Sequence, residues 1–442
     1  MAEHLLATIT DLLVAAAHGP PSTSACDLAA RLSILDALGC GIAGYDQPIV
    51  TRLTTLARAT AERGKVADAD HILVLGAALH ALDFDDINPA MFGHPTTVIL
   101  PALLVLYKFR QLPLTTLLPA FVAGTDVACI LGRYLGTDHY ERGFHATATL
   151  GAVGAAAATA NALSLDSTQT SHAIGLAASG AAGLKSVFGS MAKPLQAGRA
   201  AETGYRAALM AQAGITTAPD TLDGPGGFAA THASNPSLDR ALDAMAERPF
   251  VLSNRLKRFP SCYLTHATIA CCLEMARDRS LTRPIEKMEL TVDTGARTVC
   301  ANSDPVTGAA LKFSLQGLAA LALSGVDLSN PAYFQNWSPD TLDRADLHGR
   351  IALRFRDGMG YRVSLSATLQ GGGVHEVKDF NLDDLRPQKR DIGSILTKFR
   401  TCTARHPALG RRILRTLRLD EAANSADTQV AASREIQNMG AV

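Results

Sequence analysis

The sequence predicts a mainly α-helical protein in which a large all-α domain carries a smaller, inserted α+β domain. Apolar residues recur at helical spacing through roughly the first 265 residues, alternate in three short segments between 287 and 369, and return to helical spacing after Pro387. A chain of 442 residues also exceeds what one hydrophobic core usually supports. We therefore expect residues 1–265 and 396–442 to form the large domain and residues 266–395 the small one.

Six segments of the expected large domain have apolar residues three or four positions apart, which is the spacing of one helix face. They are 28–43, 73–83, 96–109, 115–135, 147–163 and 194–214. Small residues at 154–158, and alanines at 200, 201, 207 and 208, allow these helices to pack closely. Residues 220–236, which include Gly224-Pro225-Gly226-Gly227, are expected to form a loop.

Segments 287–294, 349–357 and 361–369 alternate apolar and polar residues, so we expect three strands. The turn Gly358-Met359-Gly360 predicts that the last two strands pair as a hairpin. A helix is expected at 310–324, and helical spacing continues after Pro387 to residue 418. The polar, alanine-rich tail at 424–442 is expected to fray.

Composition argues against several classes of protein. Lys plus Arg and Asp plus Glu number 41 each, and this balance disfavours a nucleic-acid or membrane-surface protein. The N-terminus lacks a basic leader, and the apolar segment 151–165 is too short for a membrane span. The eight cysteines form no CxxC pair, so zinc and iron–sulfur centres lose support and reduced thiols are expected. We expect a cytoplasmic protein.

Four polar residues lie where a predicted helix begins: His94, His145, Lys193 and Lys257. A helix N-terminus presents unpaired N–H groups and partial positive charge, so it binds anions and lowers the pKa of a nearby histidine. Two lysines and two neutral histidines in such places suit a substrate with two or three carboxylates, in which a histidine acts as the base.

Each of these residues also has an ordinary structural interpretation. A histidine before proline is often a cap or a packed ring, and a lone lysine is often solvated. His80 with Asp83, Asp85 and Asp86 resembles metal-ligand spacing or a capping cluster, but it matches no recognised metal pattern. We therefore expect no metal.

Several motifs appear in the order in which the MmgE/PrpD family has them. They are HALDFDD (80–86), HPTTVILPALL (94–104), GFHATATLGAVGAAAA (143–158), GSMAKPLQAGRAAETG (189–204), KRFPSCYLTHATIACCLE (257–274) and, more weakly, ALKFSLQGLAALAL (310–323). The chain thus resembles this family, which includes 2-methylcitrate dehydratases, cis-aconitate decarboxylases and iminodisuccinate epimerase. The resemblance implies a large helical domain with an inserted α+β domain, a homodimer, and activity without a metal or organic cofactor.

The resemblance also implies an active site. His94, His145, Asp83 and Lys193 form the expected catalytic group. One of the two histidines would act as acid or base at the substrate's α-carbon, and Asp83 would orient an imidazole. Lys257, Cys262 and Ser190 form the expected substrate-binding group. The substrate carboxylates would be held by Lys257 together with Lys193. Cys262 lies where some members have a histidine.

Three departures from the family pattern leave the reaction open. Ile87, Ala146 and Gly317 stand where members often have a polar residue, a proline and a tyrosine, respectively. The leading expectation is a hydro-lyase acting on a 2-methylcitrate-like acid. The alternatives are an iminodisuccinate-type epimerase, a cis-aconitate decarboxylase, and a homologue that binds a polycarboxylate without turning it over.

Overall fold

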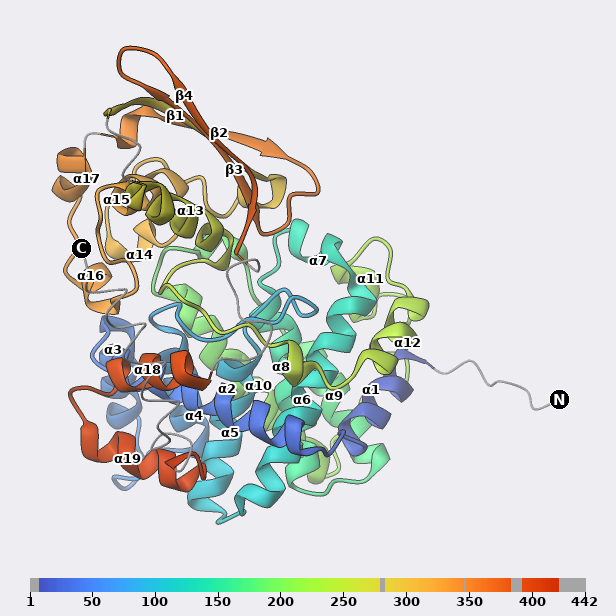
Figure 1. Cartoon of the computed structure of the whole chain (residues 1–442). Coiled ribbons are helices and arrows are strands. Elements are labelled where there is room, and N and C mark those ends of the chain that lie inside the picture. Colours follow the sequence, from blue (N-terminus) through green and yellow to red (C-terminus); the bar gives the residue numbers. More distant parts are fainter. Residues whose placement is uncertain (1–7, 279–282, 346, 383–391, 421–442) are drawn as a thin grey trace.

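The computed structural model describes residues 8–278, 283–345, 347–382 and 392–420 (Figure 1). Its buried apolar side chains form two main clusters. The larger cluster joins residues between Ile9 and Val251 with Ile395–Leu419, and the other runs from Phe259 to Leu382 with Ile87 added. Figure 1 shows a helical body with a smaller α+β part on one side. The mainly α-helical class is confirmed, whereas the domain boundaries at 265 and 395 stay predictions.

The first cluster is built from helices. They are α1 (Ile9–His18), α2 (Ser24–Ala43), α3 (Pro48–Ala59), α4 (Asp68–His80), α5 (Pro95–Phe109), α6 (Leu114–Leu135), α7 (Thr137–Glu141), α8 (Ala146–Ala162), α9 (Ser167–Gly180), α10 (Ala192–Gln212), α11 (Phe228–His232), α12 (Leu238–Glu247), α18 (Ile392–Cys402) and α19 (Pro407–Thr416). All six predicted helices are present. The expected loop at 220–236 contains the short helix α11, and the predicted fraying at 424–442 lies outside the described residues.

Small residues let the central helices touch backbone to backbone. A Cβ added at Gly76 of α4 would lie 2.7 Å from Cα of Gly198 in α10. A Cβ at Gly124 of α6 would lie 2.6 Å from the carbonyl oxygen of Gly154 in α8. Both distances are shorter than a carbon side chain tolerates, so the close packing predicted from small residues is confirmed. The packing brings the N-termini of α5, α8 and α10 towards one another.

The sheet corrects the predicted hairpin. The strands β1 (Ile285–Asp293), β2 (Ile351–Arg356), β3 (Arg362–Leu369) and β4 (Val374–Asn381) lie in the order β2-β1-β3-β4. β2 pairs with β1 in parallel, and β3 is antiparallel to both β1 and β4. The expected β2–β3 hairpin is wrong because the turn crosses the end of β1, where the Gly360 amide donates to Asp293 Oδ2 at 2.8 Å. The real hairpin is β3–β4.

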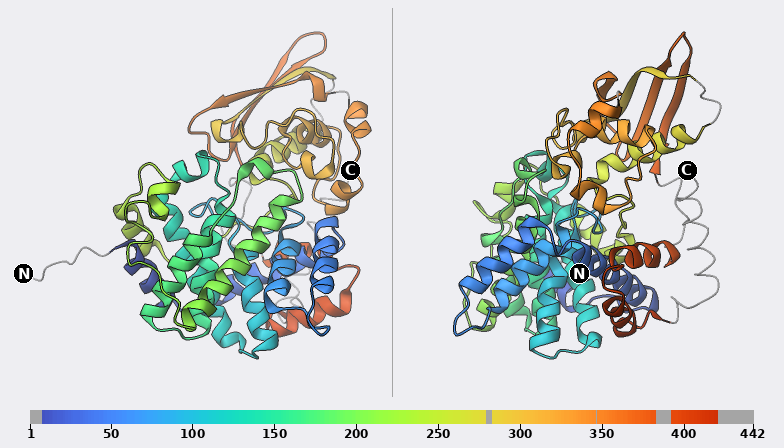
Figure 2. Two further views of the ribbon diagram at one scale, coloured as in Figure 1. Left: turned by 180° about the vertical axis from the view of Figure 1, so that it is seen from behind. Right: turned by 90° about the vertical axis from the view of Figure 1, so that its left-hand side faces the viewer.

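Helices cover one face of this sheet. α13 (His266–Arg277) and α15 (Leu315–Leu323) pack against it (Figures 1 and 2). The expected helix at 310–324 is divided into α14 (Gly308–Leu311) and α15, because Ser314 turns its side chain back to cap the Gly317 amide. The short helices α16 (Pro331–Gln335) and α17 (Asp340–Ala345) complete this part. The interruption of the helix places Lys312 against the helical body.

Among the described residues, one helix is long and apolar enough to cross a membrane. This helix is α6, and 78% of its most apolar stretch is buried inside the protein. A core helix of a globular protein passes the same test of length and composition.

Candidate functional site

Two of the predicted site histidines are the N-cap residues of neighbouring helices. His94 precedes α5 and His145 precedes α8, and both have an extended backbone. The two helix starts touch, since the His94 amide donates to Thr147 Oγ1 at 3.2 Å. A Cβ at Gly93 would lie only 2.8 Å from the Thr147 amide nitrogen, so the sequence needs glycine for this approach. The local pattern of each histidine before a helix therefore places both imidazoles in one region.

Asp83 joins the two predicted lysines. Its Oδ1 lies 3.0 Å from Lys193 Nζ and in close contact with Lys257 Nζ. Lys257 also donates to the backbone carbonyls of Asp83 and Ser261 at 3.0 Å each. Burial alone would raise the pKa of Asp83, but the two ammoniums outweigh burial and hold that pKa well below its usual range. Asp83 has a φ of +53°, an uncommon left-handed conformation that aspartate tolerates.

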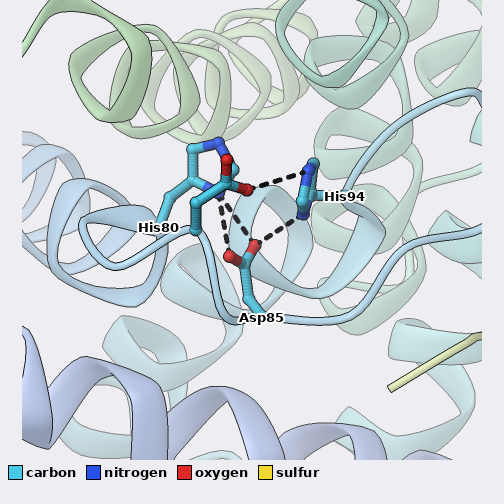
Figure 3. Close-up of side chains that lie close together, drawn as sticks. His80, Asp85 and His94 are labelled. Atoms are coloured by element: carbon cyan, nitrogen blue, oxygen red, sulfur yellow. Dashed lines mark hydrogen bonds and ion pairs between the residues drawn. The ribbon is translucent and has the colours of Figure 1, made fainter. Parts of the chain in front are cut away.

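Asp85 lies between two imidazoles (Figure 3). His80 Nδ1 is 2.9 Å from Asp85 Oδ2, and His94 Nδ1 is 3.1 Å from the same oxygen. His94 Nε2 lies farther away, 3.7 Å from Asp83 Oδ1. Burial lowers the pKa of His94 to about 3 despite the neighbouring Asp85, so this ring is neutral at pH 7. Asp85, which the sequence indicated only as part of a capping or metal-like group, is thus the carboxylate nearest to an imidazole.

His80 connects this pair to the lysines. Lys193 Nζ lies 2.9 Å from His80 Nε2, and an ammonium can only donate. His80 Nε2 therefore accepts, and its proton is on Nδ1, facing Asp85. Burial lowers the pKa of His80, which agrees with a neutral ring.

His145 has a different environment. Its Nδ1 lies 2.7 Å from Gln196 Oε1, and in the described part of the chain its buried Nε2 has no hydrogen-bond partner. Because the amide oxygen is an acceptor, His145 carries its proton on Nδ1 and leaves a lone pair on Nε2. Burial, followed by Lys193 and His80, holds the pKa of His145 well below its usual range. An unprotonated ring nitrogen therefore lies near the charge of Lys193.

Asp86 fixes the start of α5. Its carboxylate accepts from Thr96 Oγ1 at 2.6 Å and from Asn254 Nδ2 at 2.9 Å. Burial raises the pKa of Asp86 to about 7. The consecutive acidic residues of the HALDFDD motif therefore have separate contacts: lysines for Asp83, imidazoles for Asp85 and a helix terminus for Asp86.

The two remaining predicted residues are Cys262 and Ser190, and their contacts are with other parts of the chain. Cys262 is half-buried, and a hydrogen bond from the Cys300 thiol lowers the pKa of Cys262, although burial opposes this. Ser190 is exposed, and its Oγ donates to the Val187 carbonyl at 2.6 Å and accepts from the Ala192 amide. Within the described residues these Ser190 contacts are local to the start of α10.

Four residues of the cluster were missed as site members. His80 and Asp85 belong to the HALDFDD motif and lie five positions apart, which was a usable signal. Gln196 follows Lys193 by three positions on α10 and thus faces the same side of the helix. Lys312 is buried, donates to the Leu82 carbonyl at 2.7 Å, and has a pKa that burial lowers to about 8. Its position depends on the break between α14 and α15.

Four ligand atoms of the cluster lie within 4.8 Å of one another, as in a metal site; they belong to His80, Asp83, Asp85 and His94. Their neighbours do not suit a metal cation. Lys193 and Lys257 both form ion pairs with Asp83 Oδ1, and Lys193 also donates a hydrogen bond to His80 Nε2. A metal ion would have to displace two buried ammoniums, so the donor set favours an anionic ligand that shares them. Metal independence stays a prediction.

Comparisons with known proteins identify the family of this chain. The model of the MmgE/PrpD N-terminal domain matches residues 9–241, which contain His80, Asp83, Asp85, His94 and His145. Cis-aconitate decarboxylase of Homo sapiens is 33% identical over 208 residues, 44% of this chain and 41% of that protein. The same enzyme of Mus musculus is 28% identical over 286 residues, 59% of this chain and 57% of that protein. The aligned chain thus spans about half the length of these relatives. With a domain model covering more than half of its residues, the chain belongs to the MmgE/PrpD family.

Proposed function

We propose that this protein is a lyase that acts on a small di- or tricarboxylate by proton transfer at a carbon beside a carboxylate, with cis-aconitate as the first candidate substrate. One observation carries the proposal. Buried lysine ammoniums meet neutral imidazoles, and one imidazole, that of His145, has an unpartnered Nε2 within the described chain.

The charges in the cluster suit a polycarboxylate. Three buried lysines, Lys193, Lys257 and Lys312, lie near Asp83 and Asp85. One positive charge is therefore in excess, and a buried excess charge is costly unless it is paired. Carboxylates of a ligand can share the ammoniums and remove that cost. Charge-assisted hydrogen bonds of this kind are about twice as strong as neutral ones.

His145 can take or deliver the proton. In the absence of ligand its Nε2 lone pair suits a base. When a polycarboxylate enters, the added negative charge offsets the effect of Lys193 and favours protonation of the same nitrogen. The ring then becomes an acid. One residue thus serves either α-proton abstraction or protonation of carbon, depending on the bound ligand.

The relatives favour decarboxylation over the dehydration expected first from the sequence, because those described above are both cis-aconitate decarboxylases. In this reaction the bond between one carboxylate and the carbon skeleton breaks, and CO₂ leaves. The bonding electron pair passes into the unsaturated skeleton, where lysines beside the other carboxylates stabilise it. A proton from His145 is then added to carbon.

The test is incubation with cis-aconitate, 2-methylcitrate or iminodisuccinate in D₂O, followed by NMR. Loss of CO₂ from cis-aconitate with uptake of one deuterium on carbon is the expected result. Water loss from 2-methylcitrate alone would establish the dehydratase instead, and deuterium exchange without other change would establish an epimerase. If no acid reacts while all three bind, the protein is a polycarboxylate binder and the proposed lyase is wrong.

A further inference from the structure

Three consecutive backbone carbonyls in the HALDFDD motif each accept a hydrogen bond from a different lysine, two of them buried and one, Lys398, half-buried. The donors and acceptors are Lys312 with Leu82 at 2.7 Å, Lys257 with Asp83 at 3.0 Å, and Lys398 with Phe84 at 2.6 Å. The lysines come from three distant parts of the chain: the break between α14 and α15, the segment before α13, and α18. We call these three contacts the lysine clamp.

The clamped segment has to be held from outside because it is not part of a helix or strand. It follows α4, and its side chains Leu82, Phe84 and Asp85 are almost fully buried. Buried carbonyls need donors, and here lysines supply them in place of backbone amides. The left-handed backbone of Asp83 adds a conformation that the surroundings must maintain.

Lys398 contacts Asp36 and Phe84, and neither of these residues belongs to the proposed catalytic group. Its ammonium lies 2.8 Å from Asp36 on α2 and 3.8 Å from the centre of the Phe84 ring. Burial would lower the pKa of Lys398, but Asp36 raises it, so the side chain is charged at neutral pH. Lys398 thus contacts both the backbone carbonyl and the aromatic ring of Phe84. Phe84 is the residue between Asp83, which meets the lysines, and Asp85, which meets the imidazoles.

We propose that Lys398 is a positioning residue of the active site: through Phe84 it fixes the relative placement of Asp83 and Asp85. The inference rests on the proposed function for its effect on turnover, but its effect on the loop is independent of that function. A C-terminal helix outside the catalytic group therefore determines how the acidic pair is presented to Lys193 and His94. Misplacement of catalytic groups by about 1 Å can cost about 100-fold in rate.

The test compares Lys398→Met with Asp36→Asn. The first variant removes the contact with the Phe84 carbonyl. The second removes the ion pair but keeps the ammonium and an acceptor for it. Two readouts are used: turnover of cis-aconitate, and hydrogen exchange of the peptide spanning residues 81–87, whose amides at Asp83 and Ile87 are hydrogen-bonded in the structure.

Lys398→Met is expected to speed exchange in this peptide and to lower kcat by about 10- to 100-fold, with KM changed less than threefold. Asp36→Asn is expected to keep both readouts near wild type. If Lys398→Met unfolds because it leaves the buried Asp36 unpaired, the double variant Lys398→Met/Asp36→Leu removes both charges of the ion pair and replaces the single variant.

The two proposals fail separately. If the wild type turns over none of the candidate acids, the proposed function fails while the exchange readout still tests the clamp. If hydrogen exchange of the peptide 81–87 is unchanged in the Lys398 variant, Lys398 does not position this segment and the inference is wrong. Equal loss of kcat in both variants would also overturn it, because the ion pair and not the carbonyl contact would then be responsible.

Discussion

The N-termini of α5 and α8 begin alike and end up with different chemistry. Each has a buried histidine as N-cap, followed directly by an apolar helix, and each imidazole is neutral because burial lowers its pKa. At α5, both nitrogens of His94 lie within 4 Å of a carboxylate, although Nδ1 is not aligned for a hydrogen bond to Asp85. At α8, His145 has a neutral amide on one nitrogen and no partner within the described chain on the other.

The difference shows that the helix start determines where an imidazole lies. The side chain that contacts the imidazole determines whether the ring can exchange a proton with a ligand. A carboxylate partner favours the imidazolium and a neutral amide does not. His94 is therefore suited to orienting the carboxylates of Asp83 and Asp85 and to stabilising their charge. His145 is suited to exchanging a proton with a ligand. Variants at both histidines and at their neighbours test this division of roles.

The largest effect is expected at His145. His145→Ala should lower kcat by about 10²–10⁴, the usual contribution of general acid–base catalysis, with binding of the saturated acid tricarballylate largely kept. His94→Ala should lower kcat less, by about 10- to 100-fold, because it removes a neighbour of the reacting groups and not the proton carrier. Steady-state kinetics with cis-aconitate and calorimetry with tricarballylate measure both. A larger loss in the His94 variant would reverse the two roles.

Lys193 should act mainly in binding. Lys193→Met removes an ammonium that contacts both Asp83 and His80. Charge-assisted hydrogen bonds contribute about 1.5–3 kcal/mol, so KM should rise by roughly 10- to 100-fold. Lys378→Met is the matched control, because Lys378 is exposed on β4 and pairs with Glu376. An unchanged KM in the Lys193 variant would remove this residue from the site.

Sequence reasoning found the helices and the region of the site because both depend on local patterns. Helical spacing and the rule that polar residues precede helices brought His94, His145, Lys193 and Lys257 into view. The sheet order was not accessible in this way. The turn after β2 predicts only that the chain reverses, and whether β1 lies between β2 and β3 depends on contacts such as Gly360 with Asp293.

The distribution of roles within the acidic motif was also not accessible. No local pattern favours Asp85 over Asp83 as the neighbour of an imidazole. Their placement follows from the left-handed turn at Asp83, and that turn is held by lysines from distant segments. Gln196 was missed for a similar reason, since nothing local marks an amide on α10 as the partner of His145.

A smaller effect is expected at Gln196. Gln196→Leu leaves a buried N–H of His145 without its acceptor, which costs about 1–3 kcal/mol and frees the ring to change tautomer. We expect kcat to fall by roughly tenfold or more, and ¹⁵N NMR of the imidazole should show mixed protonation of its two nitrogens. Gln196→Glu should instead raise the pKa of His145, and the alkaline limb of the kcat profile, on which the protonated ring is lost, should move to higher pH. A profile unchanged in both variants would contradict the proposed tautomer.

The last prediction concerns stability and pH at α5, and it is measured by unfolding and not by turnover. Burial lowers the pKa of His94 from 6.5 to about 3 in the folded protein, so the folded state binds fewer protons than the unfolded chain between these values. The stability associated with this residue is complete above pH 6.5 and is lost as pH falls towards 3, at about 1.4 kcal/mol per pH unit. Asp86 and Asp126, with pKa values raised to about 7, act in the opposite direction as pH rises from about 4.

Because these slopes oppose each other in the wild type, the informative quantity is the difference between His94→Gln and wild type in urea unfolding. The variant should gain stability relative to wild type as pH is lowered from 6.5 to 4. The exposed His406 supplies the control variant, His406→Gln, which is unfolded in urea under the same conditions. A flat difference for His94→Gln would mean that its ring takes up a proton from solvent as readily when folded as when unfolded. His94 would then be a solvated residue, and the contrast with His145 would have to rest on kinetics alone.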